Sequence, residues 1–382
     1  MLILLFSCTT IDDAAIHTDV EHIQNIMVYP SAHIPSVLVV EFESLEPADS
    51  HVFFGYEGEM QYTTPIQREQ SIHRAYLVGM DPNSDIELKI ILETEDERYE
   101  SEKIQTQNAS LRFDQYAFEV TVDNYSFPPQ TTLLLSVFGE PCHAVMTSMD
   151  GRVFWSMEQG DSEYSGLDVM MRENHILYNT VHIGSQQMNY NPMAEGNQIH
   201  RIDLGGFSIE DYTTPLGHHF FTLGEEDDLL WLTKETQSIN DIDIKADAVM
   251  KQDDAGTEVL MSLFDIFTPP QITVDIEYVE WTHGNGLIWN AQRQSYTLSE
   301  AYNDKIVEFS VEGQPLRIIG RDAEEGEYGF FNYNHAFKFP HGVAFEGIFA
   351  AWPVCVGIAG KGISTRCRTR HGLALQVGPR KC

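Results

Sequence analysis

Basic residues are scarce in this chain of 382 residues, which has 23 Lys and Arg against 58 Asp and Glu. The formal net charge is −35. A surface this acidic repels phosphate backbones, so nucleic acid is excluded as a partner. The acidity indicates a strongly solvated surface, because a large net charge keeps a protein soluble.

Long apolar runs are missing as well. No segment reaches the ~20 residues that a helix needs to cross a bilayer. No stretch shows the periodicity of a long amphipathic helix. The sequence also lacks a Gly-rich phosphate loop, a Gly-x-Ser-x-Gly elbow and a His-Glu-x-x-His motif. These absences exclude a helical membrane protein and three common classes of catalytic site.

Cysteine is sparse, with five residues in the chain. Cys8 lies near the start, Cys142 stands alone, and Cys355, Cys367 and Cys382 lie close to the end. No pair has the spacing of a zinc site, so neither a metal nor a cofactor is predicted.

The first eight residues, Met1-Leu-Ile-Leu-Leu-Phe-Ser-Cys8, form an apolar run that ends at a cysteine. This run resembles a bacterial lipobox, in which the signal peptidase cleaves before a cysteine that then carries lipid. The alternative is a short buried strand with an incidental cysteine. The resemblance predicts a truncated signal over residues 1–8, lipidation of Cys8, and a protein anchored in the periplasm or at the cell surface by lipid only.

The last 35 residues differ in composition from the rest. Residues 348–382 contain no Asp or Glu, but they hold six of the basic residues and three of the cysteines. We interpret this segment as a non-native tail of the kind that a frameshift produces, which leaves the preceding domain incomplete. The alternative is a basic tail that binds acidic partners.

Residues 20–125 show short runs of alternating apolar and polar residues, such as 36–42 and 86–92, separated by turn clusters such as 46–50. Six or seven strands at this spacing predict a β-sandwich of the fibronectin III or immunoglobulin type.

Residues 130–347 show a different sequence pattern, in which short apolar strands are separated by turns that contain Asp and Gly, as in 144–155 and 248–260. Imperfect repeats of short strands are typical of propeller blades, and about 40–50 residues per blade predict four to five blades here. The fold class is therefore all-β, a sandwich followed by a truncated β-propeller of the six-bladed type.

Three histidines begin apolar strands at related positions of this repeat, namely His219, His283 and His341. They are spaced about 60 residues apart, roughly one enlarged blade. Residues at the start of equivalent inner strands point toward the same mouth of a propeller channel, so the three imidazoles are expected to converge. His335 is a further candidate. The alternative for each histidine is a loop residue bonded to the backbone.

Several strings resemble the bacterial arylsulfate sulfotransferase family. They are Glu280-Trp-Thr-His-Gly-Asn-Gly-Leu287 followed by Tyr296-Thr-Leu-Ser299, the paired His218-His219, and Asp150-Gly-Arg-Val-Phe-Trp155. The resemblance covers roughly residues 130–347, and the N-terminal domain suits the family's domain order.

The resemblance implies a transferase that moves a sulfuryl group from a phenolic sulfate ester to a phenol acceptor through a sulfated histidine. It places the nucleophile at His341, with His335 as the rival. His219 and His283 would bind the sulfuryl oxygens or donate a proton to the leaving phenolate. Neutral imidazole suits nucleophilic catalysis at ambient pH.

The resemblance further places His218, Asn285 and Trp281 beside the substrate, although the tryptophans of this domain are also typical blade-packing residues. The family's arginine is expected near Ala301, where this sequence has none. This departure keeps a second function open, a non-catalytic propeller that binds proteins or glycans at the cell surface.

Overall fold

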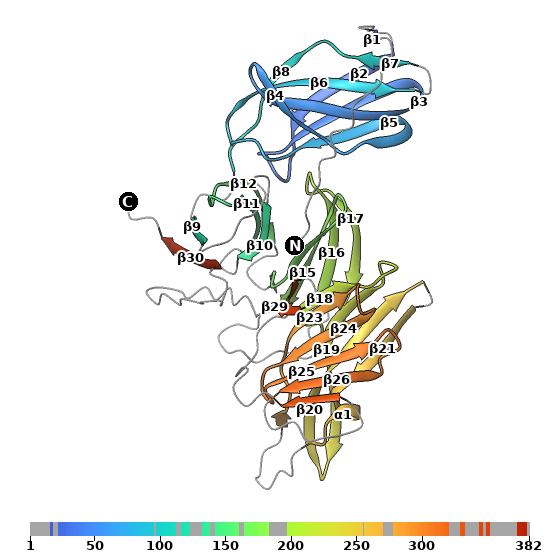
Figure 1. Ribbon diagram of the computed structural model, residues 1–382, viewed down its shortest axis with the longest axis vertical. Coiled ribbons are helices and arrows are strands. Elements are labelled where there is room, and N and C mark those ends of the chain that lie inside the picture. The colour runs from blue at the N-terminus through green and yellow to red at the C-terminus, as the bar shows by residue number, and fades with distance from the viewer. Residues whose placement is uncertain are drawn as a thin grey trace.

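The computed structural model of the chain describes residues 16–17, 22–94, 97–111, 116–122, 132–137, 142–159, 164–182, 197–254, 256–269, 278–320, 329–332, 344–346, 349–351 and 373–379. These residues form β-strands almost throughout, with an N-terminal sheet stacked above a series of smaller sheets (Figure 1). The prediction of an all-β fold is confirmed. In the described part of the chain the single helix, α1 (Leu263–Ile266), is one turn long.

The N-terminal sheet has eight strands. They are β1 (Ile16–His17), β2 (Ile23–Pro30), β3 (Leu38–Tyr56), β4 (Glu59–Thr63), β5 (Gln67–Leu77), β6 (Asp85–Glu93), β7 (Arg98–Glu100) and β8 (Ile104–Gln107). All pairs are antiparallel except the parallel pair β1–β7.

The long strand β3 joins the two halves of this sheet. Its first half pairs with β2 and β5, and its second half pairs with β4 and β6. The register of β3 against β5 breaks between Glu43 and Ala48, where β3 changes partners. Phe42 and Phe54, one from each half, lie in the same buried core. The predicted two-sheet sandwich is thus seen as one hydrogen-bonded sheet built around a single core.

Four sheets of the predicted propeller region lie below the N-terminal sheet (Figure 1). The first sheet consists of β10 (Thr132–Val137), β11 (Cys142–Ser148) and β12 (Val153–Gln159), and the second of β13 (Tyr164–Ser165), β14 (Val169–Arg172), β15 (His175–His182), β16 (Gln198–Asp203) and β17 (Ser208–Thr213). The third consists of β18 (His218–Leu223), β19 (Leu229–Ile239), β20 (Ile242–Asp253), β21 (Gly256–Ser262) and β22 (Tyr278–Glu280). The fourth consists of β23 (Gly284–Asn290), β24 (Ser295–Glu300), β25 (Lys305–Ser310), β26 (Pro315–Gly320) and β27 (Gly329–Asn332).

Strands within each of these sheets pair largely in chain order, as in propeller blades. The β19–β20 hairpin shows how the sequence specifies them, because its two central residues, Asn240 and Asp241, have φ values of 53° and 63°. Asn and Asp tolerate these angles, which a two-residue hairpin of type I′ requires. Four blades are described, in agreement with the four to five that the sequence predicted for this region. The six-bladed type of the whole ring stays a prediction.

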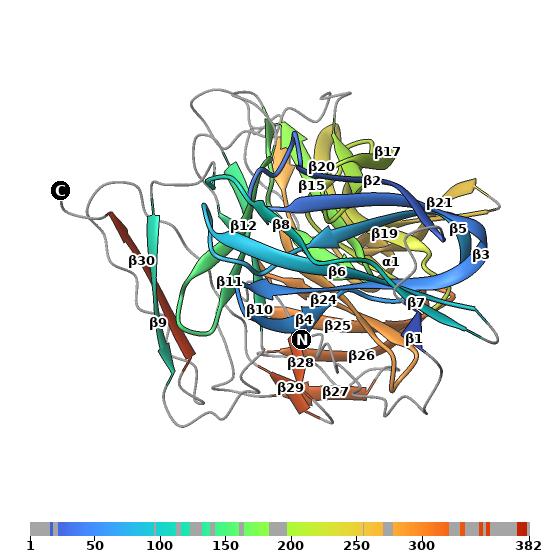
Figure 2. The same ribbon diagram turned by 90° about the horizontal axis from the view of Figure 1, so that it is seen from above.

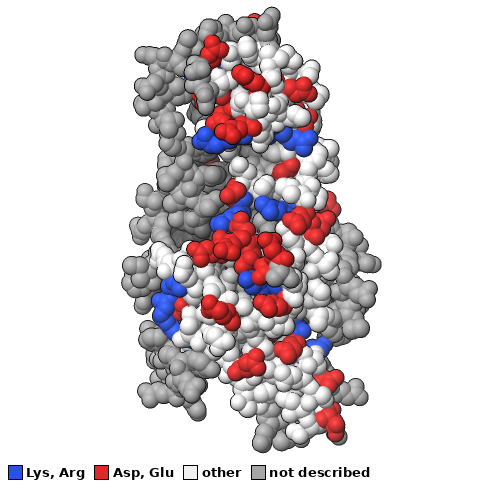
Figure 3. Space-filling model, turned by 90° about the vertical axis from the view of Figure 1, so that its right-hand side faces the viewer, with Lys and Arg blue, Asp and Glu red and all other residues white. Residues whose placement is uncertain are grey.

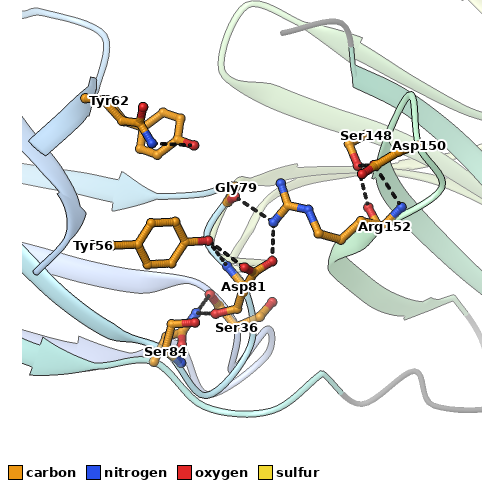
Figure 4. Close-up of polar contacts among 11 residues, drawn as sticks. Ser36, Tyr56, Tyr62, Gly79, Asp81, Ser84, Ser148, Asp150 and Arg152 are labelled. Atoms are coloured by element: carbon orange, nitrogen blue, oxygen red, sulfur yellow. Dashed lines mark hydrogen bonds and ion pairs between the residues drawn. The ribbon is translucent and has the colours of Figure 1, made fainter. Parts of the chain in front are cut away.

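The N-terminal sheet meets the first blade through apolar and polar contacts. Ile34 and Val37, between β2 and β3, share a buried cluster with Trp155 of β12. Arg152 contacts Asp81, which accepts a hydrogen bond from Tyr56 Oη at 2.7 Å (Figure 4). The two units are therefore joined by a common core as well as by an ion pair.

Two short sheets complete the described residues. β28 (Ala344–Glu346) pairs with β29 (Phe349–Ala351), and β30 (Leu373–Pro379) pairs with β9 (Tyr116–Val122). The β9–β30 pair lies at one side of the molecule in both ribbon views (Figure 2). The segment interpreted as a non-native tail thus contributes two strands, in sheets separate from the four blades. Its non-native origin stays a prediction.

The surface agrees with the charge of the sequence. On the face drawn in Figure 3, Asp and Glu spread from the N-terminal sheet to the last blades, and Lys and Arg form smaller groups among them. Among the described residues, no helix is both long and apolar enough to cross a membrane.

Candidate active site

His219 lies in a bulge at the start of β18. His218 pairs with Leu232 and Phe221 pairs with Trp231, so two residues of β18 lie between consecutive partners of β19. His219 itself has a left-handed backbone, with φ of 50°. Non-glycine residues rarely adopt this conformation, which often marks functional sites. The bulge brings the rings of His218 and His219 to a centroid distance of 5.2 Å.

His283 comes directly before β23 and is held by the last residue of β24 and the turn that follows it. Its backbone N donates to Glu300 Oε1 at 2.8 Å, and its carbonyl oxygen accepts from the Ala301 N at 2.9 Å. The Glu300 carboxylate also accepts from the Tyr302 and Asn303 amides. Glu300 is fully buried, so its three backbone donors fix this turn firmly.

The two histidines meet across neighbouring blades although 64 residues separate them in sequence. His219 Nε2 lies 3.0 Å from His283 Nε2, and the rings are nearly perpendicular. The Tyr302 ring stacks on the His283 ring at a centroid distance of 5.0 Å, and Tyr302 remains 48% exposed. The predicted convergence is therefore found for His219 and His283. His341 and His335 lie outside the described residues.

A buried lysine lies behind this pair. Lys234 Nζ contacts Asp247 Oδ1 at 3.0 Å, Glu280 Oε1 at 2.8 Å and the Thr282 carbonyl oxygen at 2.9 Å. Glu280 Oε1 lies in turn 3.3 Å from His283 Nδ1. Lys234 is thus linked to the His283 ring through the Glu280 carboxylate. It is also linked to the backbone of Thr282, the residue before His283, through the Thr282 carbonyl oxygen.

Asp247 is the second anion of the cluster and is completely buried. Its Oδ1 lies 2.8 Å from His218 Nε2, and its Oδ2 accepts a hydrogen bond from Thr282 Oγ1 at 2.6 Å. The predicted substrate contact His218 is therefore fully buried against Asp247. This position gives it a role in holding the site together.

The pKa values indicate which of these groups are charged. Burial raises the pKa of Asp247, but Lys234 and His218 outweigh it and hold that pKa far below its usual value. Burial likewise raises the pKa of Glu280, yet His283 and Lys234 bring it to about 2. Burial lowers the pKa of Lys234, while the two carboxylates raise it above its usual value. At neutral pH one cation therefore faces two anions.

Two imidazoles beside this cluster, those of His218 and His219, favour the neutral form. Burial, together with the neighbouring rings of His218 and His283, lowers the pKa of His219 well below 6.5. Burial also lowers the pKa of His218, although Asp247 opposes the shift. The Glu280 carboxylate lies 3.3 Å from His283 Nδ1 and so favours a proton on that nitrogen, which orients the ring.

The other predicted site residues take structural positions. Trp281 is buried, and its ring lies 5.7 Å from that of Phe264 in the core of its blade. Asn285 is buried on β23. Ala301, where the family's arginine was expected, is 1% exposed. Among the described residues, the cation at this site is Lys234. Cys8 lies outside the described part of the chain.

Sequence reasoning missed Lys234, Asp247, Glu280 and Glu300. A signal for two of them was present, because Glu280 belongs to the quoted string with His283, and Lys234 comes two residues after the apolar run 229–232. A lysine that continues a buried strand needs an anion beside it. No described group of three or more His, Cys, Asp or Glu side chains has the arrangement of a metal site.

Comparisons with known proteins give no family. No family model matches the chain, and no curated protein matches it. Among solved structures it is similar to a luciferin-regenerating enzyme, with a TM-score of 0.38 at 9% identity over 78% of this chain and 91% of that one. A protein of unknown function from Bacteroides caccae gives a TM-score of 0.33 at 12% identity, over 74% and 76% of the two chains.

The β-propeller domain of Cps50 (Swd1) from Myceliophteria thermophila gives a TM-score of 0.31 at 12% identity, over 82% of this chain and 91% of that one. At these TM-scores the likenesses carry no argument about activity. The description of the fold rests on the strand pairing itself.

Proposed function

We propose that the chain is an arylsulfotransferase-like enzyme, which moves a sulfuryl group from a phenolic sulfate ester to a phenol through a sulfated histidine. The observation that carries the proposal is the contact between His219 and His283, two histidines from neighbouring blades whose Nε2 atoms lie 3.0 Å apart. The motif resemblance supports the same chemistry, and the exposed Tyr302 ring supplies an aromatic surface beside His283.

The reaction takes place in two displacements. In the first, a histidine lone pair attacks sulfur, an N–S bond forms, and the S–O bond to the aryl group breaks. The departing phenolate takes a proton from a neighbouring protonated imidazole, which becomes neutral. In the second, the acceptor phenol oxygen attacks sulfur, the N–S bond breaks, and the phenol proton returns to the imidazole. Atoms and charges balance without any further reactant.

The residues have distinct parts in this proposal. His341 is the nucleophile and His335 its rival, on the basis of the motif resemblance. His219 and His283 bind the sulfuryl oxygens and exchange the proton. Donors that are held in place before the reaction stabilise charge that develops in the transition state. Glu280 keeps His283 oriented, and Lys234 keeps Glu280 in place.

The local charge of the cluster disfavours an anionic ligand at neutral pH. Lys234 is outnumbered by Asp247 and Glu280, so the cluster carries an excess of one negative charge before any imidazole is protonated. An anionic ester binds such a site best once a proton has been added to the imidazole pair. Because burial and the neighbouring rings hold the pKa of His219 well below 6.5, transfer is expected to improve as the pH falls below that value.

The alternative function is a non-catalytic propeller that binds proteins or glycans. The observation that favours it is the buried Ala301 in place of an arginine. In this case the histidine pair would be one polar contact in a rigid binding face, and no enzyme-bound intermediate would form.

Mass spectrometry after incubation with donor alone separates the two functions. The intact protein is incubated with 4-nitrophenyl sulfate and then with a phenol acceptor. An enzyme shows a sulfated histidine after the first step and sulfated acceptor after the second. His219→Gln and His283→Gln should each slow transfer. The matched control is His200→Gln, because His200 also pairs with a carboxylate, Asp211, but lies away from this pair. Absence of both products contradicts the enzymatic proposal.

We propose further that the protein acts outside the cytoplasm and is held by lipid at Cys8. Support comes only from the apolar run that precedes this cysteine. Radiolabelled palmitate should label the expressed chain and should not label a Cys8→Ser variant. Labelling of both, or of neither, contradicts the anchor.

A further inference from the structure

The unusual backbone of His219 needs an external support. A left-handed φ is unfavourable for a non-glycine residue, so it persists only where surrounding groups stabilise it. His219 has φ of 50° inside the β18 bulge. In a regular strand, neighbouring side chains would point to opposite faces of the sheet, and His219 would lose its place opposite His283.

A buried asparagine of the preceding blade contacts this residue. Asn179 of β15 donates from Nδ2 to the His219 carbonyl oxygen at 2.7 Å. Its Oδ1 accepts from the Leu167 N at 3.0 Å and from the Asp168 N at 2.8 Å. Asn179 is only 4% exposed. The side-chain amide of Asn179 therefore links the residues just before β14 to His219. Its oxygen accepts from one segment while its nitrogen donates to the other.

Asp168 reaches the other side of the bulge. Its Oδ2 accepts from the Phe221 N at 3.4 Å, and its Oδ1 accepts from the Val169 N at 2.9 Å. Asn179 thus holds the carbonyl of His219, while Asp168 holds the amide two residues later. Both supports come from the blade before the one that carries the histidine.

We propose that Asn179, assisted by Asp168, is the positioning residue that sets the ring of His219 opposite His283. The preceding blade thereby determines the geometry of a site formed by the next two. The catalytic meaning of this role rests on the proposed sulfuryl transfer. The positional effect on His219 does not, and it is measurable in the protein without substrate.

The chain offers a matched control in Asn197. This asparagine is equally buried, donates from Nδ2 to the Gly217 carbonyl oxygen at 2.8 Å, and accepts on Oδ1 from the His182 N at 2.8 Å. It makes the same kind of bridge to the same segment, two residues before His219. Each of the variants Asn197→Asp and Asn179→Asp replaces the side-chain N–H donor by a carboxylate oxygen. That oxygen then faces the backbone carbonyl oxygen to which the wild-type side chain donates.

The first readout is the imidazole spectrum, recorded as long-range ¹H–¹⁵N correlations with His219 assigned from a His219→Gln variant. Asn179→Asp should shift the resonances of His219 and of His283. Asn197→Asp should leave both close to their wild-type positions, at a similar loss of stability. A spectrum of Asn179→Asp in which the two histidines are unchanged overturns the proposal, as does an equal shift in both variants.

The second readout is kinetic. A misplacement of about 1 Å at a reacting group can reduce the rate by about 10²-fold. Asn179→Asp should therefore lower kcat by about this factor while KM changes little, and Asn197→Asp should leave kcat within about threefold. If the wild-type protein transfers no sulfuryl group, the proposed function fails while the imidazole spectra still decide the role of Asn179. If Asn179→Asp does not fold, Asn179→Ser, which keeps a short donor, is used in the same two measurements.

Discussion

Lys234 and Asp247 face each other across the β19–β20 ladder, with Nζ 3.0 Å from Oδ1 and both side chains withdrawn from water. This ion pair joins the two strands directly behind the histidine pair. Its second carboxylate, Glu280, comes from the end of β22, and its carbonyl partner belongs to Thr282. The pair thus connects two strands of a blade to the loop that carries His283.

Removal of the lysine should destabilise the protein strongly. Lys234→Met leaves Asp247 and Glu280 buried without their cation, and breaking a buried pair typically costs about 3–5 kcal/mol. Urea denaturation measures the loss. The control is Arg68→Met, which breaks an exposed pair with Asp49 and should cost less than about 1 kcal/mol. Equal effects of the two substitutions would show that the buried network contributes no more than a surface ion pair.

Asp168 should make stability depend on pH. Burial raises the pKa of this carboxyl to about 7, although the Phe221 and Val169 amides donate to it. An unfolded aspartic acid titrates near pH 4, so between about pH 4 and 7 the folded state binds the extra proton. The contribution of Asp168 to stability is therefore fully present below this window, falls as the pH rises through it, and is lost above it.

Asp168→Asn should remove this dependence. The variant is expected to match wild type near pH 4 and to exceed it by about 2–4 kcal/mol at pH 8, as the pKa shift implies. Denaturant titrations at both pH values measure the difference. Glu312→Gln, at an exposed turn, serves as the control and should have no effect at either pH. A gain that is equal at both pH values would mean that Asp168 is not the titrating group.

An arginine that replaces the one expected from the family should be tolerated better at position 302 than at position 301. Ala301 is 1% exposed, so an arginine there must displace packed atoms, and overpacking typically costs about 1–3 kcal/mol. Tyr302 is 48% exposed and stacks on His283. Tyr302→Arg should therefore retain the fold and bind an aryl sulfate more tightly, whereas Ala301→Arg should lower the melting temperature.

Binding of 4-nitrophenyl sulfate by calorimetry, with thermal unfolding of the same samples, tests this expectation. Weaker binding by Tyr302→Arg would indicate that the tyrosine ring, rather than the local charge, limits the affinity for the anion.

The identity of the nucleophile is tested by two single substitutions. His341→Ala should abolish both the sulfated enzyme and turnover. His283→Ala should instead slow both steps by about 10²–10³-fold, the usual effect of removing one donor to a developing oxyanion. Near-normal activity of His341→Ala together with inactive His335→Ala would move the nucleophile to His335. If none of the three matters, the histidines are structural.

The local sequence pattern was sufficient to predict most strands and turns of this protein. Period-two alternation and turn residues such as Asn240 and Asp241 specify strands and hairpins, because they act within a few residues. The repeated position of His219 and His283 at strand starts also sufficed to predict that they meet. Repeats carry spatial information, since equivalent residues of successive blades occupy equivalent places.

The partners of these histidines were decided by tertiary structure alone. Alternation shows which side chains share a face of a strand, but it cannot show that Lys234 meets Asp247 and Glu280, or that Asn179 of another blade bonds to the His219 carbonyl oxygen. Such contacts depend on strand register, on a bulge in β18 and on blade docking. These arise from the packing of the whole domain, because a buried charge or amide is stable only where distant segments supply its partners.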